Sequence, residues 1–179
     1  MTKSPWVAWF LLCVWSLWAS AVEARLSDPF GPFAPALGLM LVLGLAARLS
    51  TGQSLGLALV GTCGCAALCT QPIAAVFATF LGALFFLRVV RSALDVTSPL
   101  VLAVATGVAV FGAEAWGELV RETRLVHGLA LADGALWRSL ATAVSSGVAM
   151  LLVGPAIAYL PGVTPLKRNS PWSNVASVR

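Results

Sequence analysis

Residues 49–87 read LSTGQSLGLALVGTCGCAALCTQPIAAVFATFLGALFFL, which is 39 consecutive positions without a charged side chain. A straight helix of that length would extend about 58 Å, whereas the hydrocarbon core of a bilayer is about 30 Å thick. The stretch is therefore expected to cross a membrane twice. We expect the turn at Cys69-Thr70-Gln71-Pro72, because proline suits the first position of a new helix and disfavours helical angles in the residue before it. A re-entrant hairpin over 54–88 is the alternative.

The composition of the whole chain supports a membrane protein. Of the 179 residues, 59% are hydrophobic and 10% are charged, with a mean hydropathy of +0.92. Soluble domains average about 45–50% apolar and about 25% charged residues. The composition therefore excludes a water-soluble domain and a disordered chain, and four cysteines are too few for a secreted disulfide scaffold.

Five charge-free intervals of at least 18 residues mark the candidate membrane crossings: 4–22, 29–47, 49–87, 96–113 and 139–166. With the third interval divided, we expect an all-α polytopic membrane protein, a compact bundle of six transmembrane helices. The expected helices are 5–22, 33–47, 54–69, 72–88, 96–116 and 139–160. The expected organisation is a six-helix transmembrane domain, 1–162, followed by a cytoplasmic tail, 163–179, with so little apolar content that it is expected to be disordered.

The distribution of basic residues predicts the orientation, because lysine and arginine concentrate in short cytoplasmic connections. With a cytoplasmic N-terminus, seven basic residues lie on the cytoplasmic side: Lys3, Arg48, Arg88, Arg91, Lys167, Arg168 and Arg179. Four lie on the opposite side: Arg25, Arg121, Arg124 and Arg138. Both termini are therefore expected in the cytoplasm. The net charge of +4 forms no stripe with interleaved aromatic residues, so no nucleic-acid partner is expected.

The first apolar segment has a second interpretation as a signal peptide. Lys3 precedes a tryptophan-rich apolar run, and Ala19-Ser20-Ala21 or Val22-Glu23-Ala24 would provide a small-residue cleavage site. We favour a retained helix, because an even number of crossings fits the charge distribution best.

No group of side chains matches a known catalytic or metal-binding pattern. The single histidine, His127, lies in a polar connection, and the chain has no His-Glu-x-x-His, no Gly-x-Ser-x-Gly and no phosphate-binding glycine loop. Cys63, Cys65 and Cys69 are clustered, but on one helix they could not converge on one metal ion, so we interpret them as small packing residues. The chain is expected not to be an enzyme and to need no cofactor.

Small residues recur at the four-residue spacing at which two helices can approach closely. In lipid such close approach is a main source of helix association, because the hydrophobic effect does not drive apolar helices together. The predicted helix-packing residues are Gly52 and Gly56, Ala103 and Gly107, and Ala143 and Gly147.

The end of the fifth expected helix carries a regular group of charged residues. Glu114, Glu118 and Glu122 repeat every four residues, with Arg121 beside them, at the expected outer boundary of the membrane. One interpretation is a helix that emerges into water and presents a solvated face. The other is a polar anchor for a partner, since a carboxylate near lipid is costly unless it is paired. For that second interpretation the candidates are Glu114, Trp116, Glu118 and Arg121.

Several local features occur together in a fixed order. They are Pro35-Ala36-Leu37 at the start of the second span, Gly52 and Gly56 at the third, Leu87-Arg88-Val89-Val90-Arg91 ending the fourth, Thr97-Ser98-Pro99-Leu100 opening the fifth, and Leu136-Trp137-Arg138-Ser139-Leu140 before the last. In this order, over residues 33–162, the chain resembles the bacterial rod-shape-determining membrane protein MreD family. Members often carry an acidic residue at the end of the third span, where this chain has Cys65-Ala66-Ala67-Leu68-Cys69-Thr70.

The resemblance implies a non-catalytic scaffold of the cell-elongation machinery in the bacterial inner membrane. Such a scaffold holds the bitopic protein MreC and, with it, the polymerase and transpeptidase that synthesise lateral peptidoglycan and maintain cell shape. The family is also similar in fold to the substrate-capturing subunits of energy-coupling-factor vitamin transporters, which are six-helix bundles. A small-molecule-binding subunit is therefore the alternative function.

Overall fold

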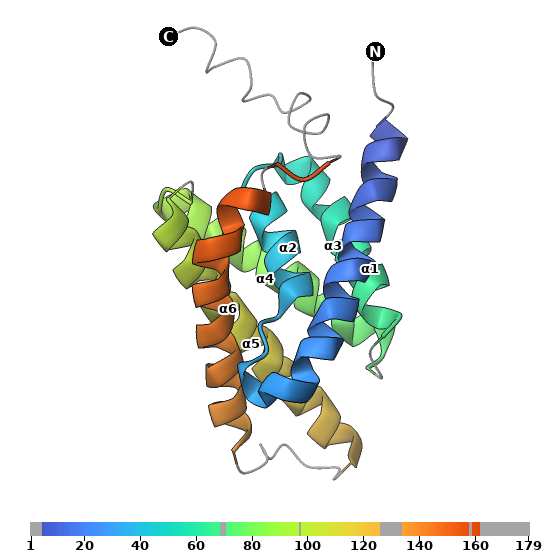
Figure 1. Cartoon of the computed structure of the whole chain (residues 1–179), viewed down its shortest axis with the longest axis vertical. Helices are drawn as coiled ribbons and strands as arrows, with labels where there is room; N and C mark the ends of the chain where they lie inside the picture. Colours follow the sequence, from blue (N-terminus) through green and yellow to red (C-terminus); the bar gives the residue numbers. More distant parts are fainter. Residues whose placement is uncertain (1–4, 69–70, 97, 126–133, 158, 162–179) are drawn as a thin grey trace, which may run out of the picture.

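The computed structural model describes residues 5–68, 71–96, 98–125, 134–157 and 159–161. These residues form six α-helices and two short 3-10 helices, with no strand among them (Figure 1). The α-helices are α1 (Pro5–Phe30), α2 (Leu37–Ala46), α3 (Ser54–Ala66), α4 (Ile73–Ala93), α5 (Pro99–Leu125) and α6 (Ala135–Ile157), and the 3-10 helices are η1 (Gly31–Phe33) and η2 (Thr51–Gln53). The predicted all-α fold is confirmed. The tail 163–179 and His127 lie outside the described residues.

Four helical segments are long and apolar enough to cross a membrane: Trp6–Phe33, Ile73–Ala93, Pro99–Arg121 and Ala135–Ile157. The helices α2 and α3 have 10 and 13 residues. They extend about 15 and 20 Å, which is less than the roughly 30 Å of a bilayer core. The described chain is therefore built as expected for a membrane protein, with four helices of spanning length and two shorter ones.

The second and third expected spans are longer than the helices that form there. The expected span 33–47 is α-helical only over α2. Pro32 and Pro35 precede α2, and proline lacks an amide hydrogen and favours an extended conformation in the residue before it. The expected span 54–69 ends as a helix at Ala66.

The predicted break in the long apolar stretch is confirmed. Helix α3 ends at Ala66 and α4 begins at Ile73, with Pro72 in extended conformation as its N-cap residue. Proline at this position leaves no missing hydrogen bond inside the helix. Residues 69–70 of the predicted turn lie outside the described part.

Helix α1 is longer than the predicted span 5–22, since it continues through three charged residues to Phe30. Ser27 Oγ donates a hydrogen bond to the Glu23 carbonyl oxygen, 2.9 Å away on the preceding turn. The charged residues therefore do not end the helix, and one of them, Glu23, bonds the start of α2 as described below.

Helix α2 lies at the centre of the bundle. Every residue from Gly38 to Leu45 is buried, and α2 contacts α1, α3, α4, α5 and α6. A helix that is apolar on all sides is typical of a buried position. In Figure 1, α1 and α6 flank α2, and the Pro5 end of α1 and the Ile157 end of α6 lie at the same end of the bundle.

Side chains from α6 bond the non-helical backbone before α2, and a side chain from α1 bonds the first turn of α2. The Ala36 amide donates to Ser146 Oγ at 2.9 Å, and Thr142 Oγ1 donates to the Pro32 carbonyl oxygen at 2.8 Å. Glu23 Oε2 accepts a hydrogen bond from the Gly38 amide at 3.0 Å, at the N-terminus of α2, where a negative charge is favourable. Backbone amide and carbonyl groups that are shielded from water require such partners within the protein. The connection and the first turn of α2 are thus bonded to the flanking helices.

Candidate functional site

Helices α5 and α6 form the most extensive contact between two helices in the bundle. A Cβ atom on Gly107 would lie 3.3 Å from the Ala143 carbonyl oxygen, and one on Gly147 would lie 3.3 Å from the Ala103 carbonyl oxygen. The structure therefore brings two of the predicted small-residue pairs against each other. The two backbones approach this closely because neither glycine has a side chain.

Above this contact lies an entirely apolar groove of about 440 Å³, which we call the α5–α6 groove. Small residues form its floor, and exposed valines from both helices form its walls. The floor residues are Ala103, Gly107, Ala143 and Gly147, the valines are Val104, Val108, Val144 and Val148, and the remaining lining residues are Phe111, Leu140 and Leu151.

A second groove, of about 510 Å³, lies between α4 and α5. Gly82 on α4 and Gly112 on α5 both line it, and a Cβ atom on either glycine would meet nothing within 4 Å. Val108 lines both grooves, and Trp116 lines this one. Val108, Gly112 and Trp116 are four residues apart and so form one outward ridge of α5 between the two grooves.

The charged end of α5 is divided between two faces of the helix. Glu114, Glu118 and Arg121 share one ridge, and Arg121 Nη2 donates to Glu118 Oε2 at 2.6 Å. Trp116 lies two positions from both glutamates, which is about 200° around the helix. The four candidate partner-contact residues therefore do not form one patch: Trp116 is exposed beside the α4–α5 groove, and Glu114 and Glu118 are partly buried. The side chain of Glu122 lies outside the described part.

We expect Arg121→Gln to change the free energy of unfolding by less than about 1 kcal/mol, because ion pairs with an exposed member contribute little. The Arg121 side chain is 49% exposed, whereas that of Glu118 is 17% exposed. The measurement is thermal unfolding in a mild detergent. A loss well above that value would mean that the pair holds the end of α5 in place.

The predicted pair Gly52 and Gly56 does not form one contact. Gly56 lies on α3 against α1, where its Cβ would be 2.6 Å from Trp9 Cη2. Gly52 lies in η2 and is exposed, and its Cβ would meet nothing within 4 Å. The 3-10 turn before Ser54 removes Gly52 from the ridge that a continuous α-helix would have formed, so the assignment of Gly52 to helix packing is corrected.

The residues around the predicted cysteine cluster lie at the contact of α1 and α3. Cys63 is exposed and Cys65 is half-buried, and Cys69 lies outside the described residues. Among the described residues, no three histidine, cysteine or acidic side chains are grouped so that they could hold a metal ion.

Sequence reasoning missed the roles of Ser146, which bonds the backbone just before α2, and of Glu23, which bonds the first turn of α2. One signal was present. Pro32 and Pro35 interrupt helical hydrogen bonding, so nearby backbone groups need other partners within the protein. The sequence contained no indication of which side chains would supply them.

Comparison of the chain with protein-family models, with curated proteins and with solved structures gave no significant match.

Proposed function

We propose that this protein is a non-catalytic scaffold of the bacterial inner membrane, of the MreD type, which binds the single transmembrane helix of the bitopic protein MreC. Through MreC it would support the polymerase and transpeptidase of lateral peptidoglycan synthesis and so cell shape. In this proposal the chain crosses the membrane six times, with α2 and α3 as short crossings and both termini in the cytoplasm.

The α5–α6 groove is the observation that carries the proposal. Its lining is apolar throughout, and its floor consists of glycine and alanine. A transmembrane helix in lipid gains little from apolar contact alone, because lipid chains are equally apolar, and it gains most where small residues allow close packing. The groove offers this arrangement on a face where the valines of α5 and α6 are exposed. A partner helix is therefore a better fit than a water-soluble ligand.

Two further features are consistent with a six-crossing topology. The Pro5 end of α1 and the Ile157 end of α6 lie at one end of the bundle (Figure 1). The greater number of basic residues also falls on the side of the termini if each helix is a crossing.

The experiment is purification of the tagged protein in mild detergent from cells that contain MreC, with Val144→Trp as the test variant. Val144 is a groove residue with 58% of its surface exposed, so an indole there fills the groove without entering the bundle. We expect recovery of MreC to fall about tenfold, a loss of about 1.4 kcal/mol. The yield and thermal unfolding of the protein itself should be unchanged.

Leu152→Trp is the matched control, because Leu152 is an exposed apolar residue on the same helix but outside the groove. It should leave recovery of MreC unchanged. Equal recovery with Val144→Trp would reject the groove as the docking site. Recovery of transporter ATPases or a bound vitamin in place of MreC would instead favour the small-molecule-binding alternative.

A further inference from the structure

A separate pocket, of about 380 Å³, lies where α2 ends, α3 begins and the second half of α4 passes over both. We call it the arginine pocket. Its polar side is formed by Ser50, Ser54, Arg88 and Arg91. Its volume falls within the range of about 300–1,000 Å³ that is typical of ligand pockets. Its position at the ends of three helices places it at the edge of the apolar bundle.

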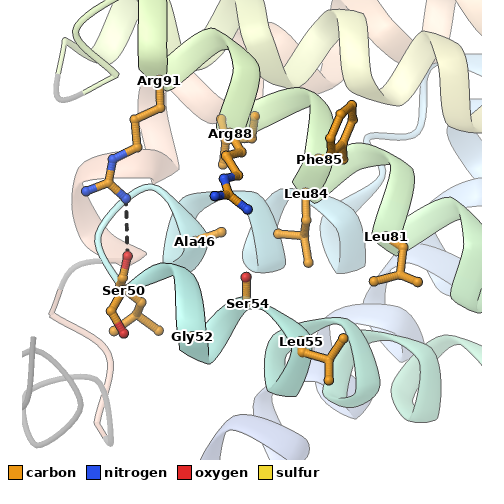
Figure 2. A pocket seen from close by; sticks show the side chains of 12 residues that line it. Ala46, Ser50, Gly52, Ser54, Leu55, Leu81, Leu84, Phe85, Arg88 and Arg91 are labelled. Carbon is orange, nitrogen blue, oxygen red and sulfur yellow. Dashed lines mark hydrogen bonds between the residues drawn. The ribbon is translucent and has the colours of Figure 1, made fainter.

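The charge of the pocket is positive. Arg88 and Arg91 both extend from α4 towards the connection between α2 and α3 (Figure 2), and none of the 12 lining residues is acidic. The N-terminus of α3 at Ser54 adds the positive end of a helix dipole. An anionic group in this pocket would therefore be stabilised by two cations and a helix N-terminus.

The two arginines differ in what they already bond. Arg91 Nη1 donates to the Leu49 carbonyl oxygen at 3.2 Å, beyond the C-terminus of α2. Arg88 is exposed and has no hydrogen bond or ion pair within the part of the chain that the structure describes. A guanidinium group can bond a phosphate through two parallel N–H groups, so Arg88 is free to make the main contact.

The rest of the pocket is apolar and open at the surface of the bundle. Leu81, Leu84 and Phe85 of α4 and Leu55 of α3 continue from the arginines along the helices (Figure 2). Leu55 is 59% exposed and Phe85 is 70% exposed. A ligand that binds here meets charge at one end and hydrocarbon at the other.

We propose that the arginine pocket binds an anionic phospholipid, with its phosphate on Arg88 and an acyl chain along Leu55, Leu81 and Phe85. Basic pockets between transmembrane helices are suited to acidic headgroups, since each basic residue near an anionic lipid contributes to binding. A free phosphate would use only the polar end, and a neutral zwitterionic lipid would bring its own cationic group close to the two arginines. This binding requires neither the α5–α6 groove nor a partner protein.

The test is native mass spectrometry of the full-length, delipidated protein, titrated with phosphatidylglycerol, with phosphatidylcholine or with inorganic phosphate. We expect one phosphatidylglycerol to bind more tightly than phosphatidylcholine. Arg88→Gln should weaken phosphatidylglycerol binding about fivefold, which corresponds to about 1 kcal/mol for one basic residue. Arg88→Glu should weaken it further. Millimolar inorganic phosphate should not displace the lipid.

Arg138→Gln is the matched control, because Arg138 is an exposed arginine that does not line the pocket. It lies near the start of α6, whereas the end of α6 lies beside Arg48, next to the pocket residue Leu49. It should bind phosphatidylglycerol as the unaltered protein does. Equal binding by Arg88→Gln, or equal affinity for phosphatidylcholine, would overturn the proposal. Complete displacement of the lipid by inorganic phosphate would assign the pocket to a free anion and would also overturn it. Unchanged thermal unfolding of Arg88→Gln confirms that the variant is folded.

Discussion

Gly64→Leu is expected to lower the free energy of unfolding by about 3 kcal/mol, at the upper end of the usual range for overpacking. A Cβ atom on Gly64 would lie 2.9 Å from the backbone carbonyl carbon of Ser16 and would also clash with the Ser16 hydroxyl oxygen. Backbone atoms cannot move aside as the end of a flexible side chain can. Displacement of Ser16 away from residue 64 would also break the hydrogen bond that Ser16 Oγ donates to the Val60 carbonyl oxygen at 3.2 Å.

The measurement is thermal unfolding of the purified protein in mild detergent. Gly82→Leu is the matched control, since a Cβ atom on Gly82 of α4 would meet nothing within 4 Å. That control should unfold at the temperature of the unaltered protein or slightly above it, because leucine favours a helix more than glycine does. If Gly64→Leu unfolded at the same temperature as Gly82→Leu, the close contact between α1 and α3 at Gly64 would be contradicted.

Ser146→Ala is expected to lower the free energy of unfolding by about 1.5 kcal/mol. The Ala36 amide, which donates to Ser146 Oγ, would lose its partner in a buried position. A buried donor without an acceptor costs about 1–3 kcal/mol, while interhelical hydrogen bonds in membranes contribute about 0.6 kcal/mol on average and up to about 1.7. We expect a value near that upper limit, because this amide precedes α2 and has no helical carbonyl as an alternative.

Ser145→Ala provides the control on the same helix. Ser145 Oγ donates to the Thr142 carbonyl oxygen within α6, at 2.9 Å, so its loss leaves no backbone amide without a partner. The expected change is below about 0.5 kcal/mol. Equal effects of the two substitutions would show that the bond from α6 to the connection does not contribute to stability.

The number of helices and the position of the main turn could be predicted from the sequence, because both depend on local features. A charge-free run has a length that can be compared with a helix, and Pro72 favours the start of a helix wherever it occurs. These are the features that gave α3 and α4 as separate helices.

The ends of α1 and α2 could not be predicted, because they depend on contacts between distant residues. Glu23 is a charged residue that would be expected to end an apolar span, but it bonds the Gly38 amide 15 residues later. The central position of α2 depends in the same way on five neighbouring helices. Only the assembled bundle determines which short apolar helix is enclosed.

The candidate site could be predicted only in part. The four-residue spacing identified Ala103, Gly107, Ala143 and Gly147 as small residues, but not that the two pairs face each other. The sequence analysis also grouped Trp116 with Glu114. Because α5 is one continuous helix through both positions, their separation of two residues puts them on different faces. The arginine pocket could not be predicted, because its walls come from three helices whose packing is not encoded in any single segment.

The bonds from Ser146 and Thr142 to the residues before α2 have a consequence for biogenesis. A ribosome completes α2 at Ala46 and α6 only at Ile157, and each of these two bonds joins residues 110 positions apart in the chain. Until α6 is inserted, the Ala36 amide and the Pro32 carbonyl group lack their partners, and the central segment must be sheltered by the insertion machinery or by water at the bilayer surface. Synthesis of the last helix is therefore the step that closes the structure.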